Sequence, residues 1–63
     1  MNFKENLKSL RKNANYTQQK LAELLHVTKT TIANYEQGVK EPKLKTLEEL
    51  TIILSCSYDD LLK

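Results

Sequence analysis

The sequence predicts an all-α fold, and three observations support this prediction. Apolar residues recur three or four positions apart in several segments, which is the spacing of one face of a helix. Glycine and proline occur once each, as Gly38 and Pro42, too few for the turns of a hairpin-rich β structure. Strict alternation of apolar and polar residues is confined to short runs, whereas helical spacing recurs along the chain. We therefore expect one compact domain of five short helices over residues 1–63.

The first two helices are expected at residues 2–13 and 18–25. Helical periodicity places the apolar residues of the first on one face: Phe3, Leu7, Leu10 and Ala14. The second begins after Thr17, whose hydroxyl can accept a hydrogen bond from a free amide of the first turn. Between the two helices, Asn15 tolerates the left-handed backbone conformation that a helix end often requires.

The third helix is expected at residues 28–37. His26 ends the second helix and opens a short turn, and Thr28 can cap the helix that follows. Gly38 ends the third helix, because glycine adopts the left-handed conformation without steric cost.

The last two helices are expected at residues 43–55 and 58–62. Pro42 can begin a helix but cannot continue one. The longer of the two has an apolar stripe formed by Leu44, Leu47, Leu50 and Leu54. Ser57, with Asp60 three residues later, has the spacing of a capping box at the start of the last helix.

Charge and composition restrict the class of protein. The 40% hydrophobic and 29% charged content is typical of a globular chain, and no apolar run reaches the roughly 18 residues that span a bilayer. The single Cys56 cannot form an internal disulfide, so we expect a cytoplasmic module without a membrane partner. Residues 1–47 contain nine Lys and Arg against four Asp and Glu, a net charge of +5. Residues 48–63 contain one against four, a net charge of −3, so positive charge accompanies the second and third helices.

The third helix has a polar face that suits the major groove of DNA. This face is opposite the apolar positions Ile32 and Tyr35, contains no acidic residue, and consists of Lys29, Thr30, Ala33, Asn34 and Gln37. Amide and hydroxyl groups can bond base edges there, and a cation can meet guanine or phosphate.

An enzyme is not expected. The only histidine, His26, has no nucleophile in register with it, and Gly38 alone cannot form a glycine-rich phosphate loop. No group of residues has metal-ligand spacing. We therefore expect no catalytic residues, no metal and no cofactor.

Two short motifs are similar to those of a known family. Residues 17–22 have the pattern T-Q-x-x-L-A, residues 32–38 have I-x-x-Y-E-x-G, and E-P-K-L follows at residues 41–44. From Leu7 to Leu62 the chain resembles the phage-repressor and Cro-type helix-turn-helix family, also called the XRE family. The resemblance implies a lambda-repressor-like five-helix domain with its helix-turn-helix at residues 18–37. Such domains insert the third helix in the major groove and commonly bind operators as dimers.

The resemblance also implies roles for individual residues. The base-reading residues would be Lys29, Thr30 and Asn34. The phosphate-binding residues would be Thr17, Gln18, Thr28, Thr31, Lys40, Lys43 and Lys45. Arg11 and Glu36 would form a partly buried ion pair that positions the third helix more than it stabilises the fold.

The chain departs from the family pattern at four positions. His26 and Asn15 replace residues that are usually or often glycine, and both types are enriched among non-glycine residues in the left-handed conformation. Ala33 is smaller than the polar residue often found there, which removes one base contact. Lys43 replaces the serine or threonine that commonly caps the fourth helix.

The expected function is sequence-specific transcription regulation on double-stranded DNA. We expect a nucleoid-associated repressor that binds a pseudo-palindromic operator as a homodimer, at least on DNA. The alternative is an antitoxin or adapter that uses the same fold to bind a protein partner. One helical stripe cannot bury every apolar residue between 50 and 54, so a small dimer patch is expected at Ile52, Tyr58 and Leu62.

Overall fold

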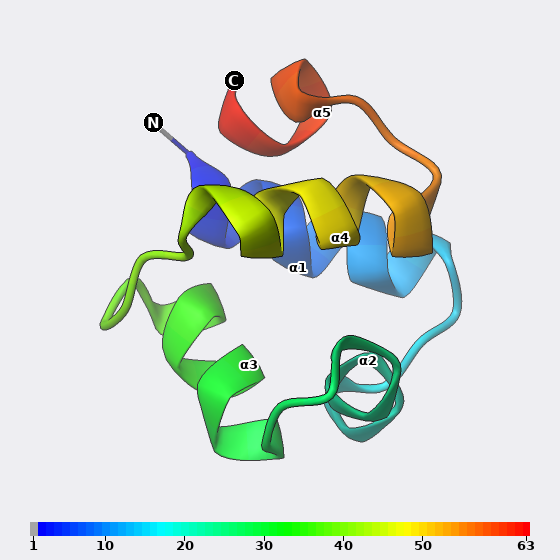
Figure 1. Cartoon of the computed structure of the whole chain (residues 1–63), viewed down its shortest axis with the longest axis vertical. Helices are drawn as coiled ribbons and strands as arrows, with labels where there is room; N and C mark the ends of the chain where they lie inside the picture. The colour runs from blue at the N-terminus through cyan, green and yellow to red at the C-terminus, as the bar shows by residue number, and fades with distance from the viewer. Residues whose placement is uncertain (1) are drawn as a thin grey trace.

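Five α-helices form the fold in the computed structural model, which describes residues 2–63, and no strand occurs in that range. The helices are α1 (Phe3–Asn13), α2 (Gln18–Leu25), α3 (Lys29–Gln37), α4 (Leu44–Leu54) and α5 (Tyr58–Leu62). In Figure 1, α2 and α3 lie together below α1 and α4, and α5 lies on the opposite side. The all-α prediction is confirmed, and each predicted helix end lies within one residue of the observed end.

Side-chain caps fix three of the helix starts. The hydroxyl of Thr17 accepts a hydrogen bond from the Lys20 amide at 3.0 Å, and that of Thr28 accepts one from the Thr31 amide at 3.2 Å. Ser57 and Asp60 exchange both bonds of a capping box, as predicted. Each cap satisfies an amide that has no partner inside its own helix.

Among residues 2–63, four adopt the left-handed conformation, each at the end of a helix or just after it. Asn15 and His26 both have φ near 61°, and Gly38 has φ 77°, as the sequence leads us to expect. The fourth, Ser55, has φ 51° and caps the end of α4. Serine is not a residue type that favours this conformation, so the left-handed backbone at Ser55 is not predicted from the sequence.

Every helix contributes one large, fully buried side chain to a single core. These five side chains are Leu7, Leu21, Ile32, Leu50 and Leu61. Burial of each stabilises the fold by about 1.5–3 kcal/mol relative to exposure. Since each comes from a different helix, the core fixes the positions of α2 and α3 relative to the rest of the molecule.

One predicted core position is wrong. Leu44 was expected in the buried stripe of the fourth helix, but 73% of it is exposed. A three-residue step along a helix falls about 60° short of a full turn, so a stripe built on such steps rotates away from the core. Leu50 and Leu54 face the core, whereas Leu44, at the first turn of α4, lies at the edge of the stripe. Ile52 points outward as predicted and is 72% exposed.

Candidate nucleic-acid interface

The outer face of α3 is polar along its length. Ile32 and Tyr35 are buried against the other helices. On the opposite side Lys29 and Thr30 are exposed, and Asn34 is partly buried. The structure thus brings the three expected base-reading residues onto one face of α3.

The expected phosphate-binding residues come from the starts of α2 and α3 and from the segment that follows α3 in the chain. Thr17 and Thr28 are exposed at the starts of α2 and α3, and the Thr28 and Thr31 hydroxyls are 3.0 Å apart. The first amides of α2 have no partner within the helix, and this end of a helix has a partial positive charge. Three exposed lysines follow α3 in the chain: Lys40, Lys43 and Lys45.

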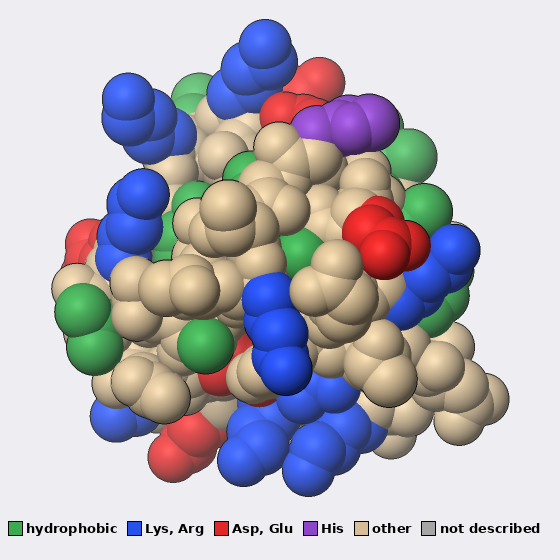
Figure 2. Space-filling model, turned by 90° about the horizontal axis from the view of Figure 1, so that it is seen from below, with side chains coloured by type: hydrophobic (Ala, Val, Ile, Leu, Met, Phe, Trp, Pro, Cys, Tyr) green, Lys and Arg blue, Asp and Glu red, His purple; other side chains and the backbone are tan. Residues whose placement is uncertain are grey.

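The face of the molecule that includes α2 and α3 is mainly uncharged and polar. Figure 2 views the molecule from below relative to Figure 1, and tan groups cover most of the surface. Lys and Arg side chains gather at the lower edge and upper left, with one near the centre, whereas acidic side chains are fewer and scattered. Such a surface combines hydrogen-bonding groups with cations placed to meet a polyanion.

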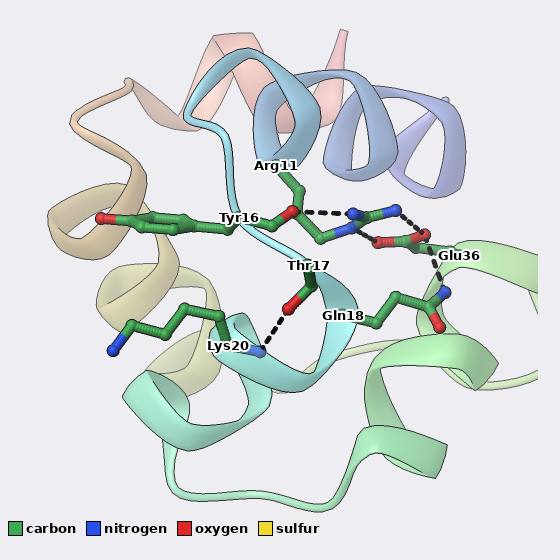
Figure 3. Close-up of polar contacts among 6 residues, drawn as sticks. All are labelled: Arg11, Tyr16, Thr17, Gln18, Lys20 and Glu36. Carbon is green, nitrogen blue, oxygen red and sulfur yellow. Dashed lines mark hydrogen bonds and ion pairs between the residues drawn. The ribbon is translucent and has the colours of Figure 1, made fainter.

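An ion pair between Arg11 and Glu36 joins α1 to α3 (Figure 3). Arg11 Nε lies 2.6 Å from Glu36 Oε2, and its second terminal nitrogen lies 3.1 Å from Oε1. The remaining terminal nitrogen donates to the Tyr16 carbonyl at 2.8 Å, in the segment that leads into α2. The guanidinium therefore holds the segment before α2 and the last turn of α3 at a fixed separation.

Gln18 extends this network. Its Nε2 donates to Glu36 Oε1 at 3.2 Å, which links the first residue of α2 directly to α3 (Figure 3). From the sequence, Gln18 is expected to bind phosphate alone, and this contact with Glu36 is not predicted. No sequence signal points to the Tyr16 carbonyl either, because every residue carries a backbone carbonyl.

Residues 2–63 contain neither a metal-binding cluster nor a membrane-spanning helix. No three His, Cys, Asp or Glu side chains in this range come together where they could hold a metal ion. None of the helices described there is both long and apolar enough to cross a membrane.

Comparison with known proteins identifies the family. A model of the helix-turn-helix family matches residues 7–61. The chain belongs to the helix-turn-helix family. Members of this family are non-enzymatic DNA-binding proteins, and this domain is therefore not an enzyme.

Three curated relatives are similar over almost all of this chain. Two from Bacillus subtilis, each 46% identical over 61 residues, are the SPbeta prophage-derived uncharacterized HTH-type transcriptional regulator YonR and the uncharacterized HTH-type transcriptional regulator YqaE. The HTH-type transcriptional activator BcrR of Enterococcus faecalis is 39% identical over 62 residues. The matches cover 97–98% of this chain but only 56%, 53% and 30% of the respective relatives. The chain thus spans about half the length of the first two.

Proposed function

We propose that this domain binds double-stranded DNA sequence-specifically and regulates transcription, with α3 in the major groove. The observation that carries the proposal is the acid-free outer face of α3, which α2 and the Arg11–Glu36 pair hold in place. The names of the relatives, which are transcriptional regulators, support the same function.

In this proposal the residues divide into readers and anchors. Lys29, Thr30 and Asn34 read base edges from α3. The anchors hold phosphates without reading sequence, and they are Thr17, Gln18, Thr28, Thr31, Lys40, Lys43 and Lys45. Because the side chain of Gln18 is already bonded to Glu36, Gln18 offers its backbone amide to a phosphate.

We further propose that two copies bind a pseudo-palindromic operator. Ile52 on α4 is 72% exposed, and Tyr58 on α5 is 42% exposed. Leu62, four residues after Tyr58 on α5, is partly buried. A dimer through this patch would place two α3 helices roughly 34 Å apart, one helical turn of DNA. Binding at such a site within a promoter excludes polymerase, so we propose that the protein represses transcription. We also propose that it does so in the cytoplasm, at the nucleoid. Repression is supported if the expression of a reporter gene falls when the protein is present. It is contradicted if that expression rises, as would be expected of an activator, which is what the relative BcrR is named.

Binding to DNA can be tested directly. Random duplex DNA is selected on the purified protein, and the enriched sequence is then titrated by fluorescence anisotropy at several salt concentrations. Because contacts to phosphates release counterions, affinity should fall steeply with salt. A flat salt response, or the absence of any enriched sequence, would contradict sequence-specific DNA binding.

A matched pair of variants locates the binding face. Lys29→Ala removes an exposed cation from the α3 face, and Lys63→Ala removes one from the acidic C-terminal part of the chain. Lys29→Ala should weaken binding, whereas Lys63→Ala should leave it unchanged or slightly tighter. Equal losses in the two variants would show that general charge, rather than the α3 face, governs binding.

A further inference from the structure

The side chain of Lys4, in the first turn of α1, crosses the end of α3. Its Cδ lies 3.1 Å, and its Nζ 3.7 Å, from the point where a β-carbon on Gly38 would be. The preceding residue, Phe3, packs edge-on against Tyr35 with ring centroids 6.0 Å apart and an interplanar angle of 81°. Two consecutive residues of α1 therefore contact the last turn of α3 and its cap.

The end of α3 lacks a cation of its own. The last turn of a helix carries a partial negative charge on its unsatisfied carbonyls, and a nearby cation stabilises it. No basic residue occurs in the last turn of α3. The Gly38 and Val39 amides bond the Tyr35 and Asn34 carbonyls, which leaves the final carbonyls of the helix without such partners. The Arg11 guanidinium at this turn is already bonded to the Glu36 carboxylate and the Tyr16 carbonyl. The ammonium of Lys4 is therefore placed to offset the negative end of α3 from another helix.

We propose that Lys4 is a positioning residue for α3. Its ammonium neutralises the C-terminal end of the helix, and its methylene chain covers Gly38, where a larger residue would displace it. Through Gly38, Lys4 fixes the end of α3 and the start of the loop that carries Lys40. An effect of Lys4 on DNA affinity rests on the proposed function, whereas its effect on the end of α3 does not.

A direct contact from Lys4 to a DNA phosphate is the competing explanation. Lys4 and Lys40 line a hollow of about 200 Å³, together with Glu41. An anion in this hollow would meet both the Glu41 carboxylate and the negative end of α3. Within residues 2–63 no ion pair joins Lys4 to Glu41. The surroundings therefore favour a role for Lys4 at the helix end over one as a phosphate ligand.

Three variants separate the charge of Lys4 from its packing. Lys4→Met keeps an unbranched chain over Gly38 and removes the charge, and Lys4→Arg keeps both. Lys8→Met is the matched control, since Lys8 is exposed on α1 and does not line the hollow. Hydrogen exchange of the Gly38 and Val39 amides should quicken about two- to fivefold in Lys4→Met, the effect of one charge at a helix end. It should stay unchanged in Lys4→Arg and Lys8→Met.

The same variants are then titrated with the selected DNA and with unrelated DNA. Lys4→Met should lower the ratio of specific to non-specific affinity about two- to fivefold while the salt slope stays the same. A slope smaller by about one would instead identify Lys4 as a phosphate contact and overturn the proposal. Unchanged amide exchange in Lys4→Met, or the same change in Lys8→Met, would also overturn it. If the wild-type protein binds no DNA, the proposed function fails, and the exchange experiment still decides the role of Lys4.

Discussion

Arg11 and Glu36 form a nearly buried ion pair, with Arg11 Nε 2.6 Å from Glu36 Oε2 and side-chain exposures of only 9% and 4%. Removing two such charges from water costs about as much free energy as their attraction returns. The value of the pair therefore lies in geometry, because it fixes α3 to α1 and to the segment before α2. Gln18 adds a third hydrogen bond to the same carboxylate.

Breaking the pair from one side should be severe. Arg11→Met leaves the Glu36 carboxylate buried without its cation and leaves the Tyr16 carbonyl without its donor. We expect a loss of about 3–5 kcal/mol in the free energy of unfolding. A domain of this size has only roughly 3–9 kcal/mol in total. Urea titration followed by circular dichroism should therefore find the unfolding midpoint shifted far toward zero denaturant.

Replacing both partners provides the control. The double variant Arg11→Met with Glu36→Leu removes both charges together, so it should recover most of the lost stability. If the double variant is as unstable as the two single losses added together, the residues are not coupled. That result would contradict the role assigned to the pair.

The sequence predicts the helices of this domain better than the contacts between them. Helix ends follow from local chemistry, such as the Thr17 and Thr28 caps and Gly38. Each can be predicted from the few residues of a single turn. The bond from Gln18 to Glu36 depends on how α2 and α3 pack, so local sequence does not reveal it. The exposure of Leu44 has the same origin, because only the position of α4 on the core decides which edge of its stripe is covered.

Ser55→Gly should stabilise the fold. Ser55 has φ 51°, a conformation that costs a residue with a β-carbon about 1–2 kcal/mol, whereas glycine adopts it freely. Allowing for the extra entropy of glycine in the unfolded chain, we expect a gain of about 1 kcal/mol, or roughly 4–8 °C in Tm. Ser9→Gly, at an exposed position inside α1, should lose about 0.5 kcal/mol in the same thermal melts. A loss of stability in both variants would contradict strain at Ser55.

The Cys56 thiol should react slowly in the folded protein. Partial burial, and secondarily the negative charge of Asp60, raises the pKa of this thiol, which lowers the thiolate fraction. Alkylation by iodoacetamide at pH 8.5 should be slower in the native protein than in urea. Asp60→Asn keeps an acceptor for the Ser57 amide and should lower the pKa only part of the way. Equal pH–rate profiles in native and unfolded protein would rule out the shift.

The same pKa shift determines a dependence of stability on pH. The folded state holds the Cys56 proton more tightly than the unfolded state, so its contribution is fully present below the ordinary thiol pKa. This contribution is lost as pH rises through the raised folded value. Cys56→Ser should remove that part of the alkaline loss of stability in urea titrations. A matching alkaline loss in the variant would show that Cys56 contributes nothing to it.

Readers and anchors on the DNA-binding face should respond differently to alanine. Asn34→Ala should cost about 1–3 kcal/mol on the selected sequence and relax the preference at particular base pairs. Lys43→Ala should weaken all sequences alike and reduce the salt slope by about one. Anisotropy titrations on single-base variants of the selected DNA measure both effects. A uniform loss in both variants would remove the distinction between the two groups.

The proposed dimer patch can be tested with two residues of α4 that are equally exposed. Ile52 is 72% exposed and belongs to the patch, whereas Leu44 is 73% exposed and does not. Ile52→Glu should abolish the dimer mass in light scattering, while Leu44→Glu should leave it intact. The comparison is made without DNA, because Leu44→Glu places a carboxylate between the proposed anchors Lys43 and Lys45. The patch lies within residues 48–63, which carry a net charge of −3, so two copies repel each other there. Added salt should therefore tighten the dimer while it weakens DNA binding, and an unchanged dimer in Ile52→Glu would exclude this patch.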